Sequence, residues 1–307
     1  RISDTHERKK REYPKIYIGD YQMKIVMVWN KTLKRGDIHK IDIGFWNTYY
    51  SLLQLGHQVY FYDTASEPEK SLSSVVEDFK PELIYCCMTG DPSLTPFEPW
   101  DDLVKEKDKG RCKTFNWFCD DTWRFDSFSS RVCNVFHVCS TVEKEYIEKF
   151  KDIDYDNIIH AMWHTNLDFY PKVVNKDIDI SFCGIPNVER QSFTNALNNQ
   201  GMPVKYEYGI SHEDMCELFS RSKISLNFSK NMTLTPPRRQ IKARLFEVPA
   251  GNTLLCTEET PGLEEYYKIN EEVVTFSSPL ELYEKCNYLL KNENVLKREF
   301  GKKDVTR

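Results

Sequence analysis

The sequence contains no long hydrophobic run. Nowhere in its 307 residues does a stretch approach the roughly 20 consecutive apolar residues needed to cross a bilayer, so we expect no membrane span. Residues 1–15 are polar and basic without an apolar centre, which excludes a secretory signal and favours a cytoplasmic protein. Because the first residue is Arg1 rather than Met, we expect the natural start to lie upstream.

The ten cysteines lack the spacing of a metal site. No C-x-x-C pair occurs, and most of the cysteines lie in apolar, strand-like runs such as residues 83–88 and 134–139. Free thiols buried in a reducing compartment are the simplest interpretation. The missing ligand spacing also argues against structural zinc.

The chain has no excess of positive charge. Its net charge is −5, which argues against a broad nucleic-acid surface. Basic clusters at residues 9–11 and 31–35 are open to two interpretations, as phosphate contacts or as a solvated surface.

With 40% hydrophobic and 29% charged residues, the composition is that of a globular protein with a substantial core. The length suits two domains of roughly 150 residues each.

Apolar runs of strand length alternate with helical patterns through the first half. A polar loop (residues 30–42) follows the first run, and the apolar spacing after it indicates a helix that ends at Gly56. The motif at residues 140–143 resembles a capping box that opens a helix. We expect strands at residues 23–29, 59–63, 82–88, 113–121, 134–140 and 157–164, forming a parallel, doubly wound sheet.

A similar alternation fills the second half. The polar segment 166–176 is interpreted as a linker, and Ser211 and Ser278 are predicted helix caps, with Pro279 at the first helical position. Strands are expected at residues 177–184, 203–209, 223–229, 252–258 and 272–278. We therefore predict an N-terminal extension (1–22), an N-terminal Rossmann-like domain (23–168) and a C-terminal one (169–307).

Polar residues gather where the strand at 223–229 meets the helix expected at 241–250. They are Asn227, Ser229, Arg244 and Glu247. Ligands bind at the carboxyl ends of parallel strands, where a basic side chain suits a phosphate and a nearby glutamate suits a sugar hydroxyl. This pattern predicts a nucleotide-sugar site. Alternatively, Glu247 pairs with Arg244 on the same helix, and Asn227 and Ser229 simply end a strand.

The motif R-L-F-E-V-P-A-G at 244–251, between K-I-S-L-N-F-S and P-G-L-E-E-Y-Y, resembles the CgeB-like glycosyltransferases. The resemblance extends to residues 55–59, 118–125 and 177–184, and so covers nearly all of residues 23–300. These proteins are relatives of glycosyltransferase family 4. The resemblance implies the GT-B architecture, an α/β fold with two Rossmann-like doubly wound domains facing a cleft.

The same resemblance implies a nucleotide-diphosphate sugar donor, expected to be UDP-linked, held mainly by the C-terminal domain. Glu247 matches a glutamate that touches the ribose, whereas Arg239 occupies the position of a sugar-binding glutamate. Arg238, Arg239, Lys242 or Arg244 would then face the diphosphate, since arginine binds phosphate oxygens bidentately. Gly184 and Arg190 match a phosphate-side loop, although Arg190 is equally compatible with an ordinary helix-surface charge.

The acceptor is expected in the N-terminal domain. Asp120 and Asp121 end a strand there, and one carboxylate could serve as a general base. Neighbouring strand residues face opposite ways, so at most one is catalytic, and a helix cap or turn is the alternative for both. His39 and His164 are further acceptor-side candidates, with a structural role as the alternative.

Metal dependence is not expected. The D-x-D triplets at 152–154 and 177–179 lie in a linker and at the start of a buried strand, rather than at an exposed strand end. We predict a metal-independent transferase with no cofactor beyond its co-substrate. A nucleotide-sugar epimerase and an inactive sugar-nucleotide or glycan-binding protein are the alternatives. The donor sugar, the oligomeric state and the acceptor remain open; the acceptor could be a glycan, small molecule, protein or modified DNA base.

Overall fold

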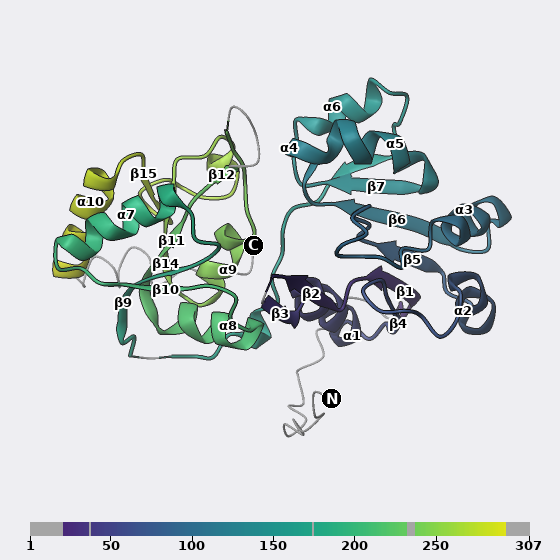
Figure 1. The fold of residues 1–307 in the computed structure, drawn as a ribbon, viewed down its shortest axis with the longest axis horizontal. Coiled ribbons are helices and arrows are strands. Elements are labelled where there is room, and N and C mark those ends of the chain that lie inside the picture. The colour runs from purple at the N-terminus through teal and green to yellow at the C-terminus, as the bar shows by residue number, and fades with distance from the viewer. Residues whose placement is uncertain (1–20, 37, 174, 232–236, 293–307) are drawn as a thin grey trace.

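The computed structural model describes residues 21–36, 38–173, 175–231 and 237–292. Two parallel β-sheets with helices packed around them lie side by side, one from each half of the chain (Figure 1). Within the described ranges, no helix is both long and apolar enough to cross a membrane.

The N-terminal sheet is wholly parallel. Its order is β4-β1-β5-β6-β7-β8, formed by β1 (Lys24–Trp29), β4 (Gln58–Asp63), β5 (Leu83–Cys86), β6 (Lys113–Phe118), β7 (Val138–Thr141) and β8 (Ile158–His160). Alternate side chains of β1 enter two separate apolar clusters, Val26 and Val28 on one face and Met27 and Trp29 on the other. A strand buried on both faces requires the nearly continuous apolar run found in the sequence.

Helices connect these strands. They are the π-helical turn Phe45–Tyr49 with α1 (Tyr50–Gln54), α2 (Leu72–Phe79), α3 (Trp100–Lys109), α4 (Asp121–Arg124), α5 (Ser130–Val132) and α6 (Tyr146–Lys151). Two expectations are corrected here. The polar loop 30–42 contains an antiparallel hairpin, β2 (Thr32–Arg35) and β3 (Ile38–Ile41). The capping box at 140–143 is wrong, because β7 continues through Thr141, which pairs with Phe118 of β6, and the helix begins only at Tyr146.

The C-terminal sheet repeats the topology with five parallel strands. Its order is β10-β9-β11-β14-β15, formed by β9 (Ile178–Cys183), β10 (Val204–Glu207), β11 (Ser222–Asn227), β14 (Leu254–Glu258) and β15 (Val274–Phe276). Its helices are α7 (Val188–Asn199), α8 (His212–Arg221), α9 (Arg244–Ala250) and α10 (Pro279–Lys291). A short antiparallel pair, β12 (Lys230–Asn231) and β13 (Arg238–Arg239), precedes α9.

The predicted caps of α8 and α10 are confirmed. Ser211 accepts a hydrogen bond from the Asp214 amide and Ser278 from the Glu281 amide, with Pro279 at the first helical position. All ten cysteines are free, and nine of them are buried, as the sequence suggests. The first sheet ends at His160 and the second begins at Ile178, so the expected domain boundary at 168/169 falls between them and stays a prediction.

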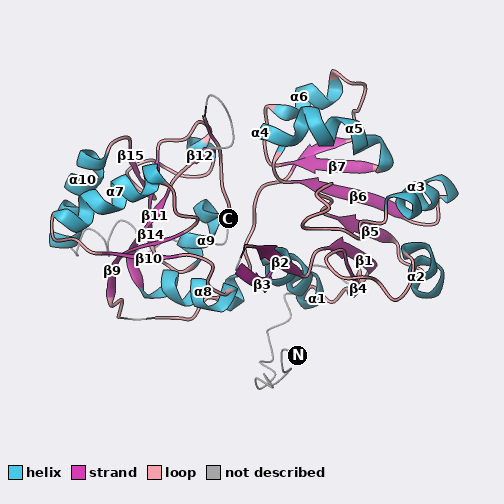
Figure 2. Cartoon of the chain, in the orientation of Figure 1, coloured by secondary structure: helices cyan, strands magenta, loops and turns pink. Residues whose placement is uncertain are grey.

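In both sheets the first strand lies between the second and third. This order places a topological switch point between β1 and β5 and another between β9 and β11. The arrowhead of β6 points toward the C-terminal half (Figure 2), so the carboxyl end of the first sheet faces the second. Ligands of open parallel sheets bind at such positions.

Candidate functional site

A cavity of about 260 Å³ opens at the carboxyl ends of β1, β5 and β6. Its walls come from residues at or just beyond these strand ends, among them Asn30, Met88 and Asp120. Four tryptophans also line it: Trp29, Trp117, Trp123 and Trp163. The cavity therefore occupies the position where the strand order predicts a ligand.

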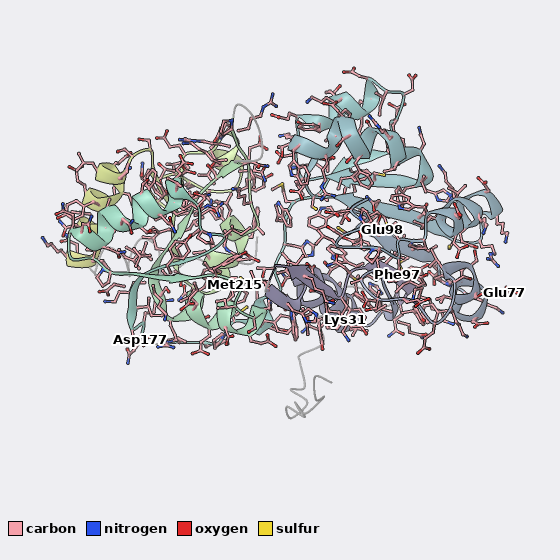
Figure 3. The ribbon with its side chains drawn as sticks, in the orientation of Figure 1. Lys31, Glu77, Phe97, Glu98, Asp177 and Met215 are labelled. Carbon is pink, nitrogen blue, oxygen red and sulfur yellow. The ribbon has the colours of Figure 1, made fainter. Side chains whose placement is uncertain are left out.

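The loop after β5 forms one wall and is held by Glu98, which Figure 3 labels in the N-terminal half. Its carboxylate accepts hydrogen bonds from the amides of Thr89 (2.6 Å) and Gly90 (3.0 Å) and from Trp100 Nε1 (3.1 Å). Hydrogen bonds to an ionised acceptor are stronger than neutral ones. These hydrogen bonds hold the loop in the position that forms this wall.

The structure separates the two adjacent aspartates. Asp120 follows β6 and lines the cavity. Asp120 occupies the N-cap position of α4, as the alternative expected, and its carbonyl accepts from the Trp123 and Arg124 amides, although its side chain makes no capping bond. Asp121 is only 1% exposed, and burial raises the pKa of its carboxyl to about 6, partly offset by the hydroxyls of Ser129 and Thr141. Of the two carboxylates, Asp120 is the one placed to meet a ligand.

The two histidines also differ in position. His164 lines the cavity, and its Nε2 lies 2.7 Å from Thr48 Oγ1. Protein packed around the ring lowers the pKa of His164, which keeps the imidazole neutral at physiological pH. His39 is exposed on β3, opposite Lys34, and is not among the residues that line the cavity. The cavity therefore brings His164, and not His39, together with Asp120.

Two candidate cations lie on the C-terminal side. Lys242 Nζ donates to the carbonyls of Phe228 (3.0 Å) and Lys230 (2.7 Å). Burial and the nearby Arg190 lower the pKa of Lys242 to about 7. Arg190 is also largely enclosed; it donates to the Ile185 carbonyl at 2.8 Å, and burial lowers its pKa. The alternative of an ordinary solvated surface charge does not describe Arg190.

The two halves meet beside these charges. Thr122 Oγ1 donates to Gln240 Oε1 of the other half at 2.9 Å. Thr122 is two positions from Asp120, and Gln240 is two positions from Lys242. The negative charge of Asp120 acts on Lys242 and favours its protonated form. Asp120 and Lys242 therefore lie near each other at the junction of the two halves, with Arg190 near Lys242 on the C-terminal side. Sequence reasoning missed Gln240, because nothing local marks a residue that bridges two sheets.

The residues at the end of β11 are engaged within the protein. Asn227 Nδ2 donates to Thr257 Oγ1 at 2.9 Å. The Ser229 amide and hydroxyl donate to the carboxylate of Glu258, at 2.7 and 3.3 Å. Glu258 is buried at the carboxyl end of β14, and sequence reasoning missed it. The strand-end pattern that selected Asn227 would also have selected Glu258, since the apolar run of β14 ends on it.

Glu247 forms an ion pair with Arg244, the alternative that the sequence left open. The pair is not an exposed one, because Glu247 is 0% exposed. Arg244 Nε also donates to the Cys183 carbonyl at 2.9 Å, and its guanidinium lies over the Phe219 ring. The expected ribose contact of Glu247 stays a prediction, and it would require a nucleotide to reach a side chain that the protein encloses.

Gly184 and Arg239 have clear structural partners. A Cβ at Gly184 would lie 2.7 Å from the Phe182 ring, so packing alone requires a glycine there. Arg239, on β13, donates to the Glu259 carbonyl at 2.7 Å. Residues 232–236 of the loop before it lie outside the described residues. The diphosphate roles expected for Arg238, Arg239 and Arg244 stay predictions.

The D-x-D triplet at 177–179 lies away from the cleft. Asp177 is paired with Arg221, at 2.9 and 2.5 Å, and Figure 3 shows it at the lower edge of the C-terminal half. Asp179 is paired with Lys223. Both carboxylates thus have structural partners.

Two Rossmann-like parallel sheets, the first with its carboxyl end toward the second, have the architecture of the GT-B fold, and the comparisons agree. Residues 175–307 match the family model described as glycosyl transferase-like. Among solved structures, sucrose-phosphate synthase of Thermosynechococcus elongatus superposes with a TM-score of 0.57 at 10% identity over 92% of each chain. A putative UDP-N-acetylglucosamine 2-epimerase of Listeria monocytogenes gives 0.56 at 9% identity over 90% of each chain.

Anabaena Alr3699/HepE, solved with UDP and glucose, gives a TM-score of 0.51 at 14% identity, over 92% of this chain and 96% of that one. No curated protein matches the chain by sequence. At these identities the similarities establish the GT-B fold, and the narrower CgeB-like resemblance stays a prediction.

Proposed function

We propose that this protein transfers a sugar from a nucleotide diphosphate, UDP by expectation, to an acceptor held in the N-terminal cavity. The observation that carries the proposal is the proximity of Asp120 to Lys242, with Arg190 beside Lys242, near the Thr122–Gln240 bridge. The glycosyl transferase-like match over residues 175–307 and a GT-B neighbour solved with UDP and glucose support it.

The charges of the side chains indicate the role of each residue in the reaction. Lys242 and Arg190 bind the diphosphate and stabilise the negative charge that develops as the sugar–phosphate bond breaks. The acceptor hydroxyl oxygen bonds to the anomeric carbon, and its proton passes to the Asp120 carboxylate. Since side-chain cations neutralise the leaving group, we propose a metal-independent reaction. Closure of the two halves would exclude water and limit hydrolysis of the donor.

A thermal-shift titration tests donor binding. A ligand present at 100 times its Kd adds about 2.7 kcal/mol to the free energy of unfolding, so UDP and UDP-sugars should raise Tm by several degrees. Uridine, which lacks the diphosphate, is the control and should give a much smaller shift. No shift with any nucleoside diphosphate or nucleotide sugar would overturn the proposal. Donor turnover without an acceptor would instead favour an epimerase, the activity named for the Listeria neighbour.

Donor affinity should depend on pH through Lys242. Its pKa is about 7 in the free protein, and a bound diphosphate favours the charged amine. Affinity for a UDP-sugar is therefore highest below pH 7 and falls as pH rises through 7, by about tenfold or more at pH 8.5. Calorimetric titration of Lys242→Met should show weaker binding at pH 6 and a flat pH profile.

Lys223→Met is the matched control for this titration. Lys223 lies at the amino end of β11, paired with Asp179, and should not affect the pH profile. An unchanged pH dependence in Lys242→Met would show that Lys242 does not contact the diphosphate.

A further inference from the structure

The charges in the cavity are mostly negative. Asp42, Asp91 and Asp120 line it, and among the described lining residues Arg124 carries the only formal positive charge. Arg124 is already engaged, because its guanidinium donates to the Thr89 carbonyl and lies 4.3 Å from the centre of the Trp123 ring. An acidic ligand would meet like charge here, with little compensating cation.

The apolar part of the wall consists largely of indole rings. The ring centres of Trp29 and Trp117 are 5.6 Å apart, and those of Trp117 and Trp163 are 4.9 Å apart. Trp123 remains 40% exposed. Such faces pack against apolar C–H surfaces and attract cations. They give an anionic group no favourable partner.

The volume of the cavity and the mixture of polar and aromatic side chains in its wall further narrow the class of ligand that would fit it. At about 260 Å³ the cavity is slightly smaller than the roughly 300 Å³ at which drug-sized ligand pockets begin, so it suits a single ring. Polar side chains alternate with the indoles around it, including Asn30, Thr48 and His164. A ring with several hydroxyls can satisfy such groups, whereas a purely apolar ring would leave them unpaired.

Building on the proposed function, we infer that the acceptor group is one sugar ring without an acidic substituent, either neutral or amine-bearing. Its apolar face packs on the indoles, and one hydroxyl lies against Asp120. Charge then directs the two substrates to different sites. The anionic diphosphate of the donor binds near Lys242 and Arg190 on the C-terminal side, and the acceptor without an acidic group binds in the cavity lined by carboxylates. The same charges disfavour a modified DNA base as the acceptor, because its backbone phosphates would be repelled by carboxylates near the cavity.

Tryptophan fluorescence titration of the full chain, without nucleotide, tests this inference. The probes are methyl β-glucoside and glucosamine against glucuronic acid and glucose 6-phosphate, which share a ring and differ in charge. We expect the first pair to bind at least tenfold more tightly than the second. Ligand-observed NMR should show at least tenfold weaker sugar binding in Trp123→Ala. The same loss is not expected in Tyr288→Ala, which removes an exposed aromatic ring on α10. Asp120→Asn should narrow the gap between neutral and acidic sugars.

Equal or tighter binding of the acidic sugars would overturn the inference, as would the absence of binding by all four probes. The UDP thermal shift, measured on the same preparation, separates the two proposals. A UDP shift without sugar binding refutes the acceptor class alone. Selective sugar binding without any nucleotide shift supports the cavity assignment and refutes the transferase.

Discussion

Replacing Asp120 by asparagine should lower kcat by about 10²–10⁴-fold while leaving the Kd for UDP nearly unchanged at pH 6, where Lys242 stays largely charged. The amide keeps the shape of the carboxylate but cannot take the proton of the acceptor hydroxyl. Asp120 lies in the wall of the cavity, and its charge acts on Lys242 of the other half. The measurement is the rate of nucleotide release with a donor and an acceptor that support turnover.

Asp121→Asn is the comparison that distinguishes the two carboxylates. Asp121 is buried and its pKa is raised to about 6, so keeping its carboxylate ionised at pH 7 lowers the stability of the folded protein. Its replacement should change kcat little and should not reduce stability at pH 7. If Asp121→Asn caused the larger loss of kcat, the base would be Asp121. If neither variant lost activity, no carboxylate at this strand end would serve as the base.

Glu247→Ala should lower the free energy of unfolding by about 3 kcal/mol, because it leaves the Arg244 guanidinium without its buried partner. Urea denaturation measures this loss. Glu148→Ala, which removes an exposed pair with Lys151 on α6, is the control and should change stability little. A loss as small as that of the control would mean that the Arg244–Glu247 pair does not hold α9 in place.

Glu247→Gln separates this structural role from the expected ribose contact. Glutamine retains the volume and a hydrogen bond to Arg244, so the fold should persist. If Glu247 binds ribose hydroxyls, the wild-type protein should prefer UDP to its 2′-deoxy and 3′-deoxy forms, and the glutamine variant should lose much of that preference. If the wild-type protein and Glu247→Gln showed the same preference for UDP over its deoxy forms, Glu247 would have only a structural role.

Local signals in the sequence were sufficient for much of the fold. The apolar run that became β1 is buried on both faces of its sheet, so its composition alone marks it as a central strand. Ser211 and Ser278 cap their helices because a cap depends on residues within three positions. The predicted cap at Ser140 is wrong because local motifs do not show pairing with distant residues. Ser140 lies in β7, which pairs with β6 more than 20 residues earlier, and this non-local pairing outweighs the capping motif.

The candidate site depended much more on tertiary structure. The sequence nominated Asp120 and Asp121 together, since both end one strand, and only the packing around α4 buries one and leaves the other in a cavity wall. Glu247 and Arg244 are three positions apart, so their pairing could be predicted from the sequence. The burial of Glu247 could not be predicted, because α8 and β9, which pack near it, come from earlier in the chain.

The sequence by itself determined that this chain forms two α/β units and that polar residues stand at the carboxyl ends of their strands. Apolar periodicity and turn chemistry are local properties, which is why they can be recognised without coordinates. Only the tertiary structure decided which of those polar residues meet. Asp120 and Lys242 are 122 positions apart, and their proximity arises from the way two separately wound sheets lie side by side. Electrostatic interaction depends on distance in space, so no spacing along the chain encodes it.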